Sequence, residues 1–189
     1  FPERIEHLIL ADPWGFVGLP QDLNKYSLYE RSQMYLTSKI SPLMVVRKAG
    51  FLGPFLFRKV RSDIVEKYEN VVEKHDETIS KYVYHCNSQK NTGELAFKHL
   101  LEIGHWPKFP MCDRIDQLCD DIPLTIIFGE NSWLTANWSN TYGPRLKEQR
   151  KESRYTQIEY IEAGHQLFSD DSKKFNRIVN EACEILKTR

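Results

Sequence analysis

His165 is the side chain of this 189-residue chain best placed to move protons. It follows the β-branched and aromatic run Thr156–Ile161 and precedes a helical pattern over Ser172–Lys187. Parallel sheets bind ligands beyond the carboxyl ends of their strands, so a histidine there can take a nucleophile's proton and return it to a leaving group. The alternative interpretation is a histidine that closes a loop and has no chemical role.

Two carboxylates could orient the imidazole of His165, and each also has a structural interpretation. Asp170 completes an H-x4-D pattern with His165, but it could instead cap the first turn of the C-terminal helix. Asp12 follows the apolar run His7–Ala11, at the carboxyl end of an expected strand. An Asp-Pro pair also starts turns, and the pattern favours Asp12 as a turn residue before Pro13. The sequence leaves both carboxylates open.

Three short segments read as buried parallel strands that would position these side chains. They are His7–Ala11, Pro123–Phe128 and Thr156–Ile161. Apolar residues at helical spacing follow the last strand over Ser172–Lys187, and the polar stretch Pro144–Glu152 is also expected to be helical. Strands that alternate with helices predict an α/β fold with a parallel sheet.

The long stretch between the first two strands contains no convincing strand. We expect helices joined by Pro, Gly and Asn, at Ser27–Ser38, Ser62–Lys74, Asp76–Tyr84 and Gly93–Glu102. A helical insertion at the carboxyl ends of the strands favours a cap over a ligand site, and a separate helical domain is the alternative. The expected organisation is core strand and turn over 1–16, cap over 17–121, and the C-terminal part of the core over 122–189.

The segment Ser41–Arg61 combines basic and large apolar side chains and contains no acidic residue. Such a mixture suits the headgroup boundary of an anionic lipid surface. Gly50, Gly53 and Pro54 should divide it into two short helical pieces. The alternative is a cap helix that packs its apolar face and keeps its charged ends in water. The candidate lipid-binding residues are Arg47, Lys48, Arg58, Lys59 and Arg61.

Composition narrows the class of protein. The chain is 41% hydrophobic and 28% charged, which is typical of soluble globular proteins. Its net charge of zero implies no bulk attraction to nucleic acid, and its apolar runs are shorter than the roughly 18 residues that a spanning helix needs. The four cysteines show no metal-binding spacing and no disulfide framework. We therefore expect a cytoplasmic protein without a metal site.

Four stretches together carry a family resemblance. They are HLILADPWGF, YHCNSQKNTGELAFKHL, DIPLTIIFGENSW and AGHQLFSDDSKKFN. They resemble the abhydrolase-domain subfamily of lysophospholipases and lysophosphatidic acid acyltransferases, which includes the coactivator of adipose triglyceride lipase. The resemblance runs almost end to end along this chain, but it covers only the C-terminal half of the family's proteins.

This resemblance implies an α/β-hydrolase fold and lipid substrates such as lysophospholipids or acylglycerols. It also implies a peripheral location on membranes or lipid droplets, with acyl-CoA as a co-substrate if the reaction is acyl transfer. No metal or organic cofactor is required. The family's G-x-S-x-G nucleophile turn, and the G-x-N-x-G of the coactivator, do not occur here and would be expected before Phe1.

The acid of the catalytic triad departs from the family pattern. α/β-Hydrolases commonly place an Asp three residues after the glycine that corresponds to Gly129, and the members of the subfamily that this chain resembles place an Asp six residues after it. This chain has Ser132 and Thr135 at those positions, and neither side chain can balance an imidazolium. Glu130 and Asp12 remain as substitutes. If no acid serves, the alternative function is a non-catalytic regulator of another lipase at a lipid surface.

Overall fold

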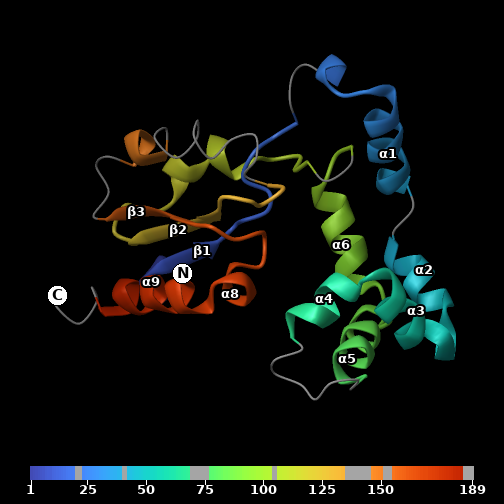
Figure 1. Cartoon of the computed structure of the whole chain (residues 1–189). Helices are drawn as coiled ribbons and strands as arrows, with labels where there is room; N and C mark the ends of the chain where they lie inside the picture. Colours follow the sequence, from blue (N-terminus) through green and yellow to red (C-terminus); the bar gives the residue numbers. More distant parts are fainter. Residues whose placement is uncertain are drawn as a thin grey trace. The chain divides into compact units, whose positions relative to one another are not determined.

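The computed structural model describes residues 1–19, 23–39, 42–68, 77–103, 106–134, 146–150 and 155–184. The chain divides into two compact units. The sheet unit comprises Phe1–Gly18 and Phe109–Arg189, and the helical unit comprises Leu19–Lys108 (Figure 1). The sheet unit therefore resumes at Phe109, earlier than residue 122, where the sequence pattern places it. The role of the insertion as a cap remains a prediction.

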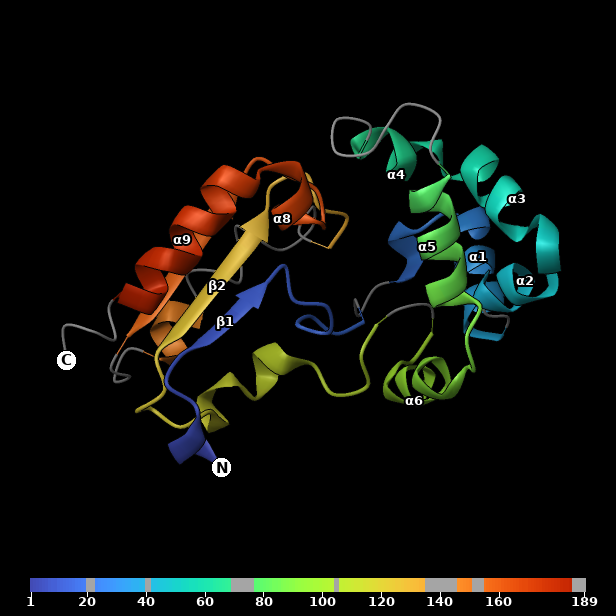
Figure 2. The same ribbon diagram turned by 90° about the horizontal axis from the view of Figure 1, so that it is seen from below.

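The sheet unit contains three parallel strands. They are β1 (Leu8–Ala11), β2 (Leu124–Gly129) and β3 (Thr156–Ile161), in the order β1-β2-β3 (Figure 2). Leu8 is level with Leu124, which is level with Thr156. The expected strands and the α/β class are confirmed.

Strand β2 is the centre of the core because it is buried on both faces. All six of its residues are buried, as the continuous apolar run predicts for an inner parallel strand. Side chains alternate between faces: Leu124, Ile126 and Phe128 join one apolar cluster, and Ile127 joins the other. The one polar side chain of the strand, Thr125, is hydrogen-bonded through Oγ1 to Nε2 of His7 at 2.9 Å.

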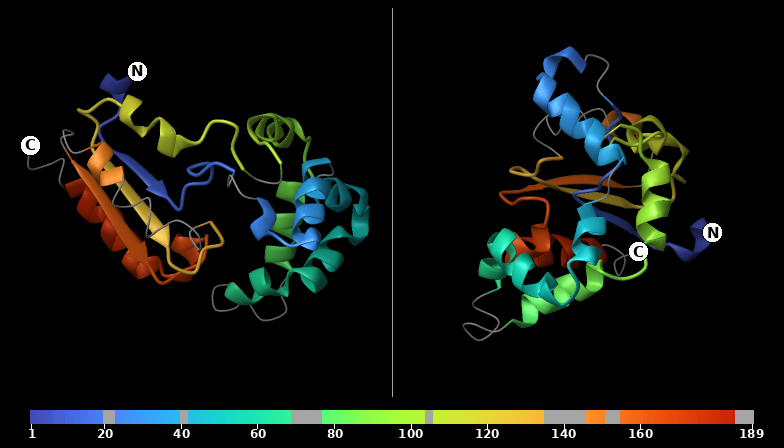
Figure 3. Two further views of the ribbon diagram at one scale, coloured as in Figure 1. Left: turned by 90° about the horizontal axis from the view of Figure 1, so that it is seen from above. Right: turned by 90° about the vertical axis from the view of Figure 1, so that its right-hand side faces the viewer.

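Each face of the sheet is covered. Helices α8 (Leu167–Asp170) and α9 (Ser172–Glu184) lie on one face, where Ile178 packs with Ile127 (Figure 3). The predicted C-terminal helix is confirmed from Ser172 to Glu184, and its last three residues lie outside the described part. The other face is covered by the segment after Phe109, whose short 3-10 turns are η4 (Met111–Asp113) and η5 (Ile115–Gln117) (Figure 1).

Arg150 fixes the segment that leads into β2. Its side chain is buried, and its guanidinium donates hydrogen bonds to the carbonyl oxygens of Ile115, Leu118 and Ile122 at 3.1–3.4 Å. Burial lowers the pKa of this guanidinium from its ordinary value. Residues 146–149 are helical, and the other residues of the expected helix except Arg150 lie outside the described part. The arginine thus ties together three backbone carbonyl groups of the segment that leads into β2.

The helical unit contains six helices among its described residues. They are α1 (Leu28–Lys39), α2 (Pro42–Lys48), α3 (Gly53–Val60), α4 (Ser62–Lys67), α5 (Thr78–Asn87) and α6 (Thr92–Leu100). Short 3-10 turns at Leu23–Lys25 (η2) and Gly50–Leu52 (η3) accompany them, and Pro2–Arg4 (η1) opens the sheet unit. All four expected helices are present; residues 69–74 of the second and residue 76 of the third lie outside the described part.

The break between α2 and α3 falls where the glycines predict it. Gly50 has a φ of 55°, which an L side chain rarely adopts. A Cβ on Gly53 would stand 1.9 Å from the ring of Tyr84 in α5, so only glycine allows this close approach. The Tyr84 hydroxyl donates to the Gly50 carbonyl at 2.7 Å. One buried tyrosine therefore fixes both sides of the break against α5.

Candidate active site

The candidate site lies at the edge of the sheet where the three parallel strands end. Asp12 follows β1, the turn from Gly129 to Ser132 follows β2, and His165 follows β3. Because the strands are parallel and in register, their carboxyl ends meet at one edge. Side chains far apart in the sequence are brought together there.

Asp12 and His165 form the central contact of this edge. His165 Nδ1 lies 2.7 Å from Asp12 Oδ2. The Asp12 side chain is completely buried, while 36% of the His165 side chain is exposed. An ionised carboxylate can only accept hydrogen bonds, so Nδ1 is the donor and Nε2 of a neutral ring is left as the acceptor. This is the arrangement that a general base requires.

Two further donors hold the Asp12 carboxylate. The backbone N–H of Gly129 donates to Oδ1 at 3.2 Å, and the Ser132 hydroxyl donates to Oδ2 at 2.5 Å. With His165, three donors from the ends of two other strands converge on one buried carboxyl group. A buried charge is tolerated in a protein only when it is paired and hydrogen-bonded in this way.

The backbone of Asp12 is in the left-handed region, with a φ of 43°. Aspartate visits this region more readily than most residues, and such conformations gather at functional sites. The Asp12 N–H still donates to the Ile127 carbonyl at 2.7 Å, so the turn begins on the last bond of the strand pair. Asp12 is therefore both a turn residue and the carboxylate that contacts His165.

Gly129 allows the loop that carries His165 to lie against the end of β2. A Cβ at this position would stand 2.5 Å from the Gly164 carbonyl oxygen and 2.6 Å from that of Ala163. The Asn131 N–H donates to the same Ala163 carbonyl at 3.1 Å. The glycine that ends β2 thus sets the distance between His165 and the ends of the neighbouring strands.

Asp170 supports the backbone next to His165. Its Oδ2 accepts a hydrogen bond from the Gly164 N–H at 2.8 Å. This contact ties the short helix α8 to the loop between β3 and His165. The role of Asp170 as an orienting acid stays a prediction. Of the two other acid positions considered from the sequence, Glu130 is exposed and Thr135 lies outside the described residues.

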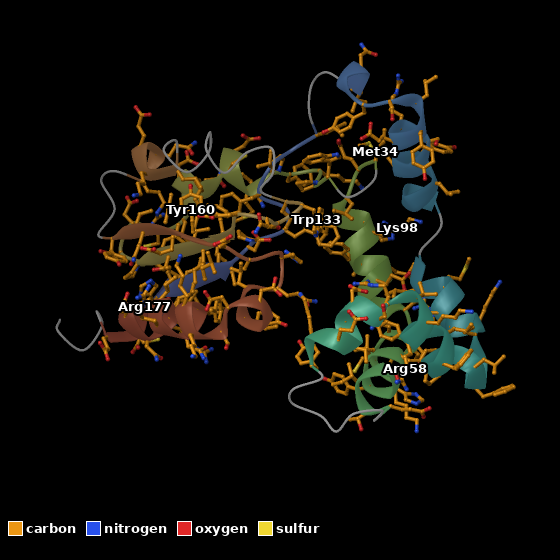
Figure 4. The ribbon with its side chains drawn as sticks, viewed as in Figure 1. Met34, Arg58, Lys98, Trp133, Tyr160 and Arg177 are labelled. Carbon is orange, nitrogen blue, oxygen red and sulfur yellow. The ribbon has the colours of Figure 1, made fainter. Side chains whose placement is uncertain are left out.

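Two tryptophans form an aromatic wall beside the imidazole. The rings of Trp133 and His165 lie 5.7 Å apart, and those of Trp14 and Trp133 lie 5.1 Å apart and perpendicular. Trp133, labelled in Figure 4, is 49% exposed, and Trp14 is 40% exposed. Trp14 was missed, although its place two residues after Asp12 was a usable signal.

The five candidate lipid-binding residues lie in the helical unit and differ in their partners. Arg47 pairs with Glu94 at 2.6 Å, and Arg61 pairs with Asp63 at 2.8 Å. The Arg61 guanidinium, through its hydrogen bond, lowers the pKa of the Asp63 carboxyl. Among the described residues, no ion pair holds the remaining three, which are Lys48, Arg58 and Lys59.

The described parts of the chain contain neither a candidate metal site nor a candidate membrane span. No group of three or more His, Cys, Asp or Glu side chains there could hold a metal ion. No helix there is both long enough and apolar enough to cross a bilayer.

Comparison with known proteins gives consistent relatives. No family model matches the chain. The (lyso)-N-acylphosphatidylethanolamine lipase of Mus musculus is 37% identical over 186 residues, which is 97% of this chain and 53% of that protein. The human 1-acylglycerol-3-phosphate O-acyltransferase ABHD5 is 34% identical over 187 residues, or 97% of this chain and 52% of that protein. The chain thus spans about half the length of these relatives.

One solved structure is a weaker match. A thioesterase domain from the curacin biosynthetic pathway is 16% identical, with a TM-score of 0.44. The match covers 100% of this chain and 59% of that domain. This likeness is too low to add to the comparison.

Proposed function

Because the chain belongs to the abhydrolase family of α/β-hydrolases, we propose that the intact protein acts on lipid acyl esters. The reaction is hydrolysis of a lysophospholipid or acylglycerol ester, or acyl transfer to lysophosphatidic acid. The observation that carries the proposal is the 2.7 Å contact between the buried Asp12 carboxylate and the half-exposed His165 imidazole. A buried acid behind an accessible histidine is the acid–base part of an acyl-transfer site.

In the proposed mechanism, His165 moves one proton in each half of the reaction. Nε2 takes the proton of the nucleophilic hydroxyl as that oxygen attacks the ester carbonyl. The imidazolium then gives this proton to the leaving alcohol as the ester bond breaks. Asp12 stays ionised and stabilises the imidazolium through Nδ1–H. Such enzymes carry their nucleophile on a G-x-S-x-G turn, which is not among these 189 residues.

The final acceptor of the acyl group decides between the two reactions. In hydrolysis, water activated by His165 releases the fatty acid from the acylated nucleophile. In transfer, acyl-CoA supplies the acyl group, its thiol leaves with the proton, and the lysophosphatidate hydroxyl takes the acyl group. His165 serves as base and then acid in both reactions, so the Asp12–His165 pair does not distinguish them.

Replacement of the histidine in the intact protein tests the proposal. His165→Gln should remove ester hydrolysis of lysophospholipids, because glutamine can neither accept nor return the proton. The matched control is His85→Gln, since His85 is an exposed histidine of α5 and should be dispensable. Activity that survives His165→Gln at the level of the control would contradict the proposed catalytic role.

A non-catalytic regulator of another lipase is the second candidate. It is favoured by Ser132 and Thr135, which occupy the usual acid positions of the family. The residue at the centre of the nucleophile turn in the intact protein discriminates the two, because serine can attack an ester and asparagine cannot. A regulator would stimulate a separate lipase equally well with His165 or with His165→Gln.

Binding to an anionic lipid surface fits either candidate, and exposed apolar side chains in η3 and α3 support it. Phe51, Phe55 and Val60 are 93%, 67% and 75% exposed. Lys48 and Lys59 are exposed close to them in the sequence, and Arg58, labelled in Figure 4, is partly exposed. Apolar side chains that enter the acyl region together with cations that meet the headgroups are typical of peripheral membrane proteins.

A further inference from the structure

We infer that the acid that orients His165 has been relocated from the end of β2 to the end of β1, with Ser132 as the residue that positions it. The carboxylate is now carried by Asp12. The hydroxyl at position 132, where many α/β-hydrolases carry the acid itself, holds that carboxylate against the imidazole. This inference rests on the proposed function for its catalytic consequence, but the geometry on which it depends can be tested without any activity.

The register of the sheet explains why two positions can serve one histidine. Strands β1 and β2 are parallel neighbours, and Ala11 is level with Ile127. Asp12 and the turn that follows Gly129 therefore leave the sheet side by side. The Ser132 N–H donates to the Gly129 carbonyl at 3.1 Å, which closes that turn and directs Ser132 inward. Ser132 is 1% exposed.

One oxygen atom, Oδ2 of Asp12, contacts both Ser132 and His165. Oδ2 of Asp12 lies 2.5 Å from Ser132 Oγ and 2.7 Å from His165 Nδ1. An aspartate at 132 would have its carboxyl carbon near the present Oγ, with its oxygens extending into the space of Oδ2. The acid can thus lie after β1, at position 12, or after β2, at position 132, without any movement of His165. The position that does not carry the acid must then have a small side chain, because the two side chains share the same space.

The hydrogen bonds of Ser132 exclude a role as nucleophile. A serine has one proton to donate, and Ser132 gives it to the Asp12 carboxylate. Its oxygen accepts a hydrogen bond from the Leu134 N–H at 3.2 Å. A nucleophile would instead point its proton at the base and be reachable by substrate. The hydroxyl therefore contacts Asp12, which in turn contacts His165.

The functional consequence is control of the histidine tautomer. With Gly129 N–H and the Ser132 hydroxyl both donating, the Asp12 carboxylate is held in one orientation. It then accepts from Nδ1–H, which keeps Nε2 unprotonated and ready to take a proton. Loss of the Ser132 hydroxyl should weaken the preference for the Nδ1–H tautomer of His165, and loss of the Asp12 carboxylate should abolish that preference.

The first experiment reads the tautomer directly by nitrogen NMR of the intact protein labelled on histidine. His165 in the wild type should be protonated on Nδ1 only. Asp12→Ser should give a mixture of tautomers, and the exchange Asp12→Ser with Ser132→Asp should restore the Nδ1–H form. Ser132→Ala should broaden or shift the Nδ1–H signal, and Ser132→Thr, which keeps the hydroxyl, should retain it.

A buried serine elsewhere gives the matched control. Ser80 in α5 is 2% exposed and donates to the Glu77 carbonyl at 2.9 Å. Ser80→Ala removes a comparable hydroxyl but should leave the His165 signals unchanged. A His165 spectrum that is the same in Ser132→Ala as in the wild type would overturn the positioning role. An exchange variant that folds but fails to restore the tautomer would overturn the relocation.

The second experiment measures ester hydrolysis by the same variants. Ser132→Ala should lower kcat about 10- to 100-fold, the loss expected for one hydrogen bond to a charged group, with little change in KM. Ser132→Thr and the exchange variant should recover most of it. If no form of the intact protein hydrolyses esters while the tautomers follow the predicted order, the proposed function fails and the relocation stands.

Discussion

The carbonyl oxygen of Gly164 lies only 2.5 Å from the point where a Cβ on Gly129 would stand. The end of β2 and the loop that carries His165 therefore touch through their backbones. This contact sets how far His165 lies from Asp12, although neither glycine takes part in the hydrogen bond between those two side chains.

Gly129→Ala should displace the loop at Ala163 and Gly164, because backbone atoms cannot yield as side chains do. We expect a loss of about 1–3 kcal/mol in the free energy of unfolding, as for other overpacked sites, and a disturbed Nδ1–H signal of His165. Urea denaturation and the NMR signal check these outcomes. The control is Gly93→Ala, whose new Cβ meets nothing within 4 Å and lies in the first turn of α6. It should cost nothing, and an equal loss in both variants would refute the explanation.

Asp12→Asn should distinguish the contribution of this residue to the turn after β1 from its function as the carboxylate that accepts the Nδ1–H of His165. Asparagine tolerates the left-handed backbone, so the turn should persist. Its amide can hold the wrong tautomer of the imidazole, and kcat for ester hydrolysis should fall by roughly 10⁴-fold, as when a triad acid is lost. Glu130→Gln, which changes an exposed acid just after β2, should leave kcat unchanged. Unchanged hydrolysis by Asp12→Asn would make Asp12 a structural residue only.

Arg150→Met should destabilise the sheet unit without touching the candidate site. The variant keeps much of the side chain's volume but removes the hydrogen bonds that the guanidinium donates to the carbonyl groups of Ile115, Leu118 and Ile122. The expected loss in the free energy of unfolding is about 3 kcal/mol. Arg177→Met on the exposed face of α9 removes only a 3.9 Å ion pair and should cost less than about 0.5 kcal/mol. A loss at Arg150 no larger than at Arg177 would show that the carbonyl contacts contribute little.

Reversal of charge at Arg58 and Lys59 to glutamate should weaken binding to vesicles that contain phosphatidylserine. Each cation near an anionic surface contributes about 1 kcal/mol, so the double variant should bind at least roughly 30-fold more weakly. Vesicles of phosphatidylcholine alone should show little difference between the variant and the wild type. Lys173→Glu together with Arg177→Glu on the exposed side of α9 is the control, because this pair reverses the same number of charges in the sheet unit. Undiminished binding of the double variant, measured by vesicle sedimentation, would end the lipid-surface proposal.

Local patterns in the sequence were sufficient for the elements themselves. The continuous apolar run of β2 predicted a strand buried on both faces, and all six residues are buried. Gly50 and Gly53 predicted the break between α2 and α3, which the structure confirms. These features follow from backbone freedom and side-chain polarity within a few residues, so neighbours in the sequence determine them.

Pairings between distant side chains could not be read in the same way. The five basic residues of α2, α3 and the turn after α3 look alike in the sequence, yet Arg47 is paired with Glu94 across 47 positions. The acid that orients His165 was ambiguous in the same way. Either Asp170 or Asp12 could have contacted the imidazole, and local spacing did not decide between them. Charge and spacing name the candidates, but the contacts depend on which elements pack together.

The sequence by itself determined that this chain has a histidine, His165, on a loop after the last strand of an α/β sheet. It also named Asp12 and Asp170 as carboxylates that could contact this histidine. Only the tertiary structure decided that Asp12, 153 residues away, is the carboxylate bonded to that histidine, and that Ser132 is bonded to Asp12. The physical reason is the strand order β1-β2-β3. Parallel pairing brings the three carboxyl ends to one edge, and no local pattern specifies which strands become neighbours.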